Sequence, residues 1–106
     1  MTLKEQKAAI LEGFDFMQLR RQMGRMDWRW AKSPGRGYAA AVPTVRRLRE
    51  SAERLLDSVI DSPAGEHWIE SGGFRAEKRN GRLALRFVVE QSVIIVNEEG
   101  CMEVHN

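Results

Sequence analysis

The sequence predicts an α+β fold, with two to three helices packed on one face of a small antiparallel β-sheet. Two observations support this prediction. Residues 44–60 repeat apolar side chains at helical spacing. Residues 74–89 alternate apolar and polar side chains on either side of an Asn-Gly pair, which is the strongest short signal for a β-hairpin. The chain therefore begins with helices and ends with a sheet.

Length and composition fit one soluble domain spanning 1–106, with a helical part at 1–62 and a β-rich part at 66–106. Hydrophobic residues make up 42% of the chain and charged residues 30%, as in ordinary globular proteins. No apolar run approaches the roughly 20 residues that cross a bilayer, and we expect no secretory signal. Cys101 is the only cysteine. An intrachain disulfide is therefore excluded, and we expect a reduced, cytoplasmic setting.

The N-terminal region predicts two short helices. Thr2 and Glu5 have the capping-box spacing, in which each side chain accepts a hydrogen bond from the other residue's backbone N–H. The first helix is therefore expected at 3–12, and Gly13 offers a left-handed residue that ends it. A second helix is expected at 15–24, because it begins with an N-capping aspartate and ends at a glycine.

Two tryptophans in Met26-Asp27-Trp28-Arg29-Trp30 lie two positions apart. Apolar and polar residues alternate in this segment, which favours an extended piece with both indoles directed into the core. A helical alternative continues the preceding apolar stripe and leaves Trp28 outside it.

Residues 31–43 contain Pro and Gly at several positions and predict a loop. Thr44 can then cap the third helix, 44–60. Charged side chains on its other faces favour pairs such as Arg49–Glu53, four positions apart. The apolar stripe of this helix consists of Val45, Leu48, Ala52, Leu55, Leu56 and Val59.

The hairpin prediction fixes a register. A two-residue loop at Asn80-Gly81 places Phe74 opposite Phe87 and orders the remaining cross-strand pairs. On the core side, Ala76 faces Leu85, and Leu83 and Val89 join them. The other side then carries Arg75, Glu77, Arg79, Arg82 and Arg86.

A further strand is predicted at 93–96, and residues 101–104 are expected to fold back on it through 98–100. Whether 82–96 forms one bent strand or two is left open. Four consecutive apolar residues cannot share one sheet face. Either both faces are covered, or one side contacts another chain, and a homodimer is one such arrangement. The candidate interface residues are Val93, Ile94, Ile95 and Val96.

Basic residues are concentrated in the middle of the chain. Residues 18–54 hold ten Lys or Arg against three acids, whereas 55–106 hold five against nine. This asymmetry indicates a polyanion-binding face, pairing between the two parts, or a solvated face. The order of helices and hairpin resembles a winged helix. A nucleic-acid-binding protein that uses the basic 20–54 region and the 73–90 hairpin is therefore the alternative function. Its candidate contacts are Arg20, Arg21, Arg25, Arg46, Arg47, Arg49, Arg79 and Arg82.

No motif in the sequence carries a recognisable chemistry. The glycines near Arg36 lack the Lys-Ser/Thr of a phosphate-binding loop. Cys101 and the two histidines, His67 and His105, do not have the spacing of a zinc site. No nucleophile is flanked by a base in a known pattern. We therefore expect no catalytic, cofactor or metal site and a non-enzymatic function.

Four stretches carry a resemblance to a protein family. They are Met-Asp-Trp-Arg-Trp at 26–30, the Pro-Thr-led helix at 43–60, Ser-Gly-Gly-Phe at 71–74 and Leu-Arg-Phe at 85–87. Together they resemble small uncharacterised proteins of tailed bacteriophages and prophages. The resemblance implies an accessory protein in the cytoplasm of a bacterial host that binds a host protein, for example to inhibit a defence or regulatory factor. The arginine-rich helix here departs from the more acidic helix of that family.

Overall fold

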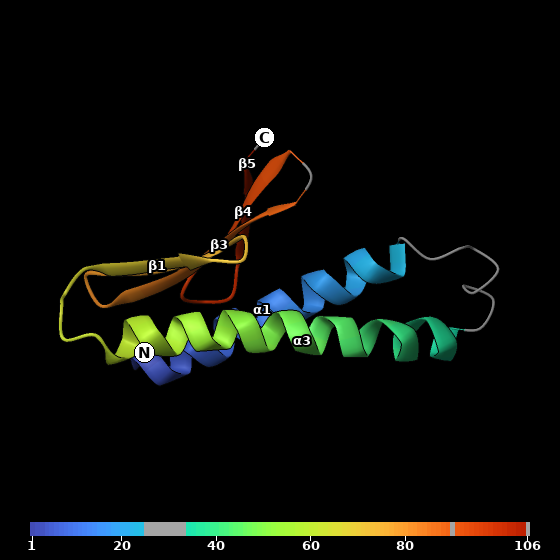
Figure 1. Cartoon of the computed structure of the whole chain (residues 1–106), viewed down its shortest axis with the longest axis horizontal. Coiled ribbons are helices and arrows are strands. Elements are labelled where there is room, and N and C mark those ends of the chain that lie inside the picture. The colour runs from blue at the N-terminus through green and yellow to red at the C-terminus, as the bar shows by residue number, and fades with distance from the viewer. Residues whose placement is uncertain (25–33, 90, 106) are drawn as a thin grey trace.

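The computed structural model describes residues 1–24, 34–89 and 91–105 (Figure 1). Five strands form one antiparallel sheet in chain order, and the two described helices pack on one of its faces. The α+β prediction is confirmed. The elements are α1 (Leu3–Gly24), α3 (Pro34–Asp61), β1 (His67–Ser71), β2 (Phe74–Arg79), β3 (Arg82–Val89), β4 (Ser92–Val96) and β5 (Met102–His105).

Helix α1 is continuous, so the predicted stop at Gly13 is wrong. A Cβ at Gly13 would lie 2.4 Å from the carbonyl oxygen of Gly100. The glycine therefore permits a close approach between α1 and the β4–β5 turn, and it does not end a helix. Asp15 lies inside the helix and is not an N-cap. The predicted capping box at the start is confirmed, because Thr2 and Glu5 exchange two hydrogen bonds of 3.1 Å.

Helix α3 begins at Pro34, ten residues before the predicted start at Thr44. The expected loop at 31–43 is therefore wrong over 34–43, and 31–33 lie outside the described residues. Proline is well tolerated at the first helical position, where its missing N–H has no helical acceptor. The alanines at 39–41 are strong helix formers and favour the helix despite the interior proline at 43.

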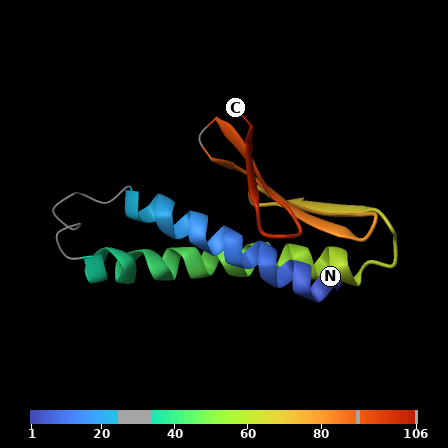
Figure 2. The same cartoon turned by 180° about the vertical axis from the view of Figure 1, so that it is seen from behind.

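The two helices lie antiparallel and side by side (Figures 1 and 2). Helix α3 is about 42 Å long at 1.5 Å per residue. Both helices extend beyond the sheet, which gives the molecule a longest extent of 50 Å. The described part is therefore a long helical hairpin. It lacks the three short helices of the winged-helix arrangement, because the first two predicted helices are one.

The predicted hairpin is confirmed in its register. Phe74 lies opposite Phe87, and Ala76 lies opposite Leu85. Residues Asn80 and Gly81 both have positive φ, 51° and 73°, as the tight turns of β-hairpins require. The open question about 82–96 is also answered, since β3 and β4 are separate antiparallel strands.

Two further turns complete the sheet. Gly72 and Gly73 both have positive φ and join β1 to β2 as a second tight hairpin. The segment Asn97–Gly100 turns the chain so that β5 folds back on β4, as predicted.

The core lies between the helices and one face of the sheet. Phe14 of α1 is fully buried and makes edge contacts with Phe74 and Phe87, with ring centroids 5.7 and 5.4 Å apart. Edge-to-face geometry is favourable for aromatic pairs. The predicted core pair Trp28 and Trp30 lies outside the described residues. The other buried hydrophobic residues are Ile10, Leu11, Ala52, Leu56, Val59, Ala76, Leu83, Leu85, Ile94 and Val96.

Candidate functional site

The sheet has two unlike faces. The helices cover one of them, and no described element covers the other, which we call the outer face. Side chains alternate along each strand, so the strand register assigns every residue to a face. The outer face carries Trp68, Glu70, Arg75, Glu77, Arg79, Arg82, Ala84, Arg86, Val88, Val93, Ile95, Glu103 and His105.

An aliphatic patch lies on the outer face of β3 and β4. It consists of Val88, Val93 and Ile95. Val88 is 58% exposed and lies directly opposite Val93, which is half-buried. Ile95 is also half-buried and lies opposite the exposed Arg86. Contiguous exposed apolar side chains with a polar rim are typical of protein interaction sites. The patch is thus the strongest candidate for a binding surface on this face.

Arginines face each other across β2 and β3. Arg75 lies opposite Arg86, and Arg79 lies opposite Arg82. Like charges directly opposite each other destabilise a sheet. Arg75 is compensated by Glu77, whose carboxylate lies 2.8 Å away. Arg86 pairs with no carboxylate among the described residues. Within the described part of the chain, its guanidinium beside the aliphatic patch is therefore not neutralised.

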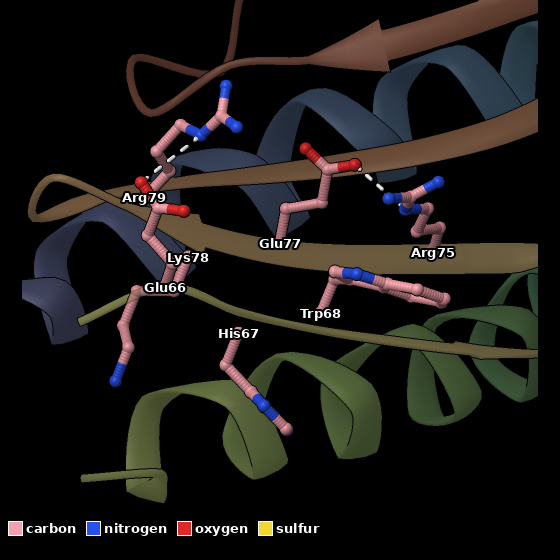
Figure 3. Close-up of a pocket in the computed structure, with 7 residues that line it drawn as sticks. All are labelled: Glu66, His67, Trp68, Arg75, Glu77, Lys78 and Arg79. Atoms are coloured by element: carbon pink, nitrogen blue, oxygen red, sulfur yellow. Dashed lines mark ion pairs between the residues drawn. The ribbon is translucent and has the colours of Figure 1, made fainter. Parts of the chain in front are cut away.

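A pocket of about 400 Å³ lies along β1 and β2 (Figure 3). The Arg75 guanidinium stacks 4.2 Å from the ring centroid of Trp68, which is half-exposed. Arg79 forms a longer ion pair, 3.6 Å, with Glu66. Arg75 and Arg79 are thus both paired with carboxylates of the same pocket. Because these charges are already paired, the pocket would select a ligand mainly by its shape. Its lining residues are Glu66, His67, Trp68, Arg75, Glu77, Lys78 and Arg79.

A second pocket of about 420 Å³ adjoins the first at the β2–β3 turn. It shares Glu77 and Arg79 with the first pocket. On its other side, Arg82 lies 3.9 Å from Glu98. Both hollows are therefore open and charged, and both lie at the opposite end of the hairpin from the aliphatic patch.

The predicted polyanion contacts whose side chains the structure describes lie in two separate places. Arg46 and Arg47 are exposed on α3, about 22 Å along the helix from its end at Asp61. The hairpin arginines, Arg79 and Arg82, lie near that end of α3. Lys78, which precedes Arg79, donates a hydrogen bond to the carbonyl of Ser62 at 2.6 Å. The remaining predicted contacts include Arg20 and Arg21 in α1, whose side chains lie outside the description, and Arg25, which lies outside the described residues.

Arg49 has a structural role that sequence spacing did not reveal. It pairs with Asp15 of α1 at 3.1 Å, in place of the predicted contact with Glu53. Glu53 instead accepts Lys7, which also contacts Asp57 at 2.7 Å. Burial raises the pKa of Asp15, and Arg49 opposes this shift only in part. These charges join the two helices and are not free to bind a ligand.

The predicted interface at 93–96 is divided by the sheet. Ile94 and Val96 are buried in the core, whereas Val93 and Ile95 face outward. Strand β4 pairs on both sides, so its backbone is not an edge. Only the two outward residues remain candidate contacts.

Sequence reasoning missed Val88 and Trp68 as candidate contacts. The signal for Val88 was present, because it is out of phase with Leu83, Leu85 and Phe87 and must point away from the core. Trp68 gave no such signal, since its strand was not recognised.

The described residues contain no group of three or more His, Cys, Asp or Glu side chains placed to hold a metal ion. None of the described helices is long and apolar enough to span a membrane. Comparison with family models, with curated proteins and with solved structures finds no match to this chain.

Proposed function

We propose that the protein is a non-enzymatic phage or prophage accessory protein that binds a host protein in the bacterial cytoplasm. The aliphatic patch carries this proposal. Val88 is 58% exposed near the end of β3 on the uncovered sheet face, beside Val93 and Ile95. Burying such side chains against a partner is favourable by about 25 cal/mol per Å² of apolar area. Inhibition of a host defence or regulatory factor is the role that such binding would serve.

The patch also indicates the chemistry of the partner. Arg86 is exposed and lies two positions from Val88 on the same face. A partner with an aliphatic surface and a nearby carboxylate would bury Val88 and pair with Arg86. Arginine suits this role because its planar guanidinium binds a carboxylate through two parallel hydrogen bonds.

Affinity capture from a bacterial lysate tests the proposal. We expect the wild-type protein to retain one partner in stoichiometric amount, and Val88→Glu and Ile95→Glu to lose it. Val88 is mostly exposed and should accept the charge, whereas Ile95 is half-buried and lies opposite Glu103, so thermal unfolding must show that Ile95→Glu is folded before it is used. Arg47→Glu on α3 is the control, because it changes charge in the same direction on a different surface, and it should keep the partner. Recovery of no stoichiometric partner, or retention by Val88→Glu, would reject the proposal.

Nucleic-acid binding is a second candidate, favoured by the opposed arginines of the outer face. Arg79 faces Arg82, and each is paired with a carboxylate only at long distance, 3.6 Å to Glu66 and 3.9 Å to Glu98, so an anion between the two arginines would stabilise them further. The half-exposed Trp68 offers a ring on which a base of a single strand can stack.

Fluorescence anisotropy with labelled single- and double-stranded oligonucleotides tests this candidate. Binding through several arginines falls steeply as salt rises. We expect Arg79→Ala with Arg82→Ala to weaken any such binding, while Arg46→Ala with Arg47→Ala leaves it unchanged if only the outer face is used. Absence of binding at low salt would eliminate the candidate.

A further inference from the structure

We propose that β5 pairs antiparallel with β5 of a second copy, so that two sheets join into one. In this arrangement Val104 faces Val104 of the second copy across a twofold axis perpendicular to the sheet. Such an axis keeps both outer faces on the same side. The inference is independent of the host-protein proposal, because it uses the edge of the sheet and not the aliphatic patch.

Strand β5 is an open edge. It is the last strand in the sheet order, and all four of its residues are exposed. The helices pack on β1 to β4, and the β4–β5 hairpin rises away from them (Figures 1 and 2). An open edge presents a row of backbone donors and acceptors that pairs readily with another strand.

The backbone of β5 has its free groups at alternate residues. Asn97 donates to the carbonyl of Cys101 at 2.9 Å, and these two residues lie opposite each other in the register. Hydrogen-bonded and non-hydrogen-bonded pairs alternate along antiparallel strands. Glu103 is therefore hydrogen-bonded to β4, whereas the N–H and C=O of Met102 and Val104 point toward the open edge.

Charge selects the register of the pairing. Centring the axis on Val104 places Glu103 opposite His105 of the second copy, twice, on the outer face. The His105 imidazole and the Glu103 carboxylate can be close neighbours, since they lie 3.3 Å apart within one chain. Centring the axis on Glu103 would instead place two carboxylates opposite each other, which is destabilising. Val104, 60% exposed, then meets its own copy on the other face.

The proposed contact is small. Strand β5 has four residues, so the interface falls at or below the roughly 1,200 Å² of weak, transient complexes. We therefore expect a reversible dimer that dissociates on dilution, with a Kd on the order of 100 μM.

Val104→Pro is the sharpest test. Proline removes the N–H that points to the second copy and leaves the hydrogen bonds between β5 and β4 in place, as edge strands tolerate. Two symmetric hydrogen bonds are lost, so we expect self-association to weaken about thirtyfold in sedimentation equilibrium. Val104→Thr keeps the N–H and is the matched control, with a Kd within about twofold of wild type. A strict monomer at millimolar wild-type concentration, or equal association by Val104→Pro, would overturn the proposal.

A charge exchange tests the register even if the proline variant fails to fold. Glu103→Lys places a lysine opposite His105 of the second copy, and His105→Glu places two carboxylates opposite each other. Each variant should therefore weaken the dimer severalfold. The double variant restores an opposite-charge pair and should recover most of the affinity. Failure of the double variant to recover would reject this register. Val88→Glu should dimerise normally, which separates this result from the capture experiment.

Discussion

At the scale of single residues, Gln6 compensates for a missing strand. Leu83 is the first core-facing residue of β3, and it lies beyond the end of the pairing with β4. Its N–H instead donates to the side-chain amide oxygen, Oε1, of Gln6 at 2.8 Å. The amide nitrogen of Gln6 donates to the carbonyl of Gly81 at 2.9 Å. One buried side chain thus connects α1 to the β2–β3 turn.

Replacing Gln6 with Met should destabilise the protein by about 1–3 kcal/mol, because the buried Leu83 N–H loses its acceptor. Lys4→Met, on an exposed position of the same helix, is the control and should change the free energy of unfolding by less than about 0.5 kcal/mol. Urea denaturation measures both. Equal stability of the two variants would show that Gln6 does not carry the connection.

Gly13→Ala should destabilise the protein although alanine is the better helix former. Helix propensity favours alanine by about 1 kcal/mol, but the new Cβ would lie 2.4 Å from a backbone oxygen of Gly100. Backbone atoms yield little, so we expect a net loss of about 1–2 kcal/mol. Gly65→Ala has open space around it and should be nearly neutral. A Gly13→Ala protein with a higher Tm than wild type would contradict the close approach.

The capping box gives a prediction in pH. The pKa of Glu5 lies below its ordinary value because the backbone N–H and hydroxyl of Thr2 donate to its carboxylate. A lowered folded-state pKa stabilises the fold above the unfolded pKa, and this contribution disappears as pH falls through the folded pKa. NMR titration of Thr2→Val should show the Glu5 pKa rising toward its ordinary value, while Thr2→Ser should keep it low. An unchanged pKa in Thr2→Val would show that the Thr2 hydroxyl does not contribute, because the backbone N–H of residue 2 still donates to the Glu5 carboxylate in this variant.

At the scale of elements, the C-terminus of α3 is stabilised from the sheet. The last turn of α3 has no basic residue, yet helix carbonyls there favour a nearby cation. Lys78 of β2 supplies it: its side chain is buried and donates to the carbonyl of Ser62 just after the helix. The contact fixes the end of the helix against the first hairpin.

Lys78→Met should therefore lower the free energy of unfolding by about 1–2 kcal/mol, since it keeps the buried volume but removes the charge and the hydrogen bond. Arg79→Met, next to it but exposed, should cost less than about 0.5 kcal/mol. Thermal unfolding compares the two. If Lys78→Met were as stable as wild type, the helix end would not depend on the cation.

The elements that sequence predicted correctly are those whose signals are local. The Asn80-Gly81 hairpin follows from turn chemistry and alternation within sixteen residues, and its register was right. The helix end predicted at Gly13 was wrong, because a helix-ending glycine and a glycine needed for close packing look the same in sequence. Only the distant Gly100 distinguishes them. The start of α3 was misplaced for a similar reason, since Pro34 permits both a loop and a first helical turn.

The candidate site was predicted only in part. Strand alternation placed Arg79 and Arg82 on the outer face, but the sequence could not show that α3 carries its arginines elsewhere. It also could not show which strand is the edge. The apolar run at 93–96 indicated an interface, while the strand order places β4 inside the sheet and makes β1 and β5 its edges.

At the scale of the whole molecule, the two helices lie together on one side of a bent sheet and leave the outer face uncovered (Figure 2). The buried side holds the aromatic cluster around Phe14. The outer side combines Val88 and its neighbours with the exposed Arg86. We propose that the buried face provides stability and that the outer face provides the binding surface. The proposed β5 pairing would double the outer face without covering it.

Amide chemical-shift mapping with the captured host protein tests this division most directly. On titration of the isotope-labelled chain, the largest shifts should fall on Arg86, Val88, Val93 and Ile95, and the exposed arginines of α3 should remain unchanged. Shifts concentrated on α3, with the outer face of β3 and β4 unperturbed, would contradict the account.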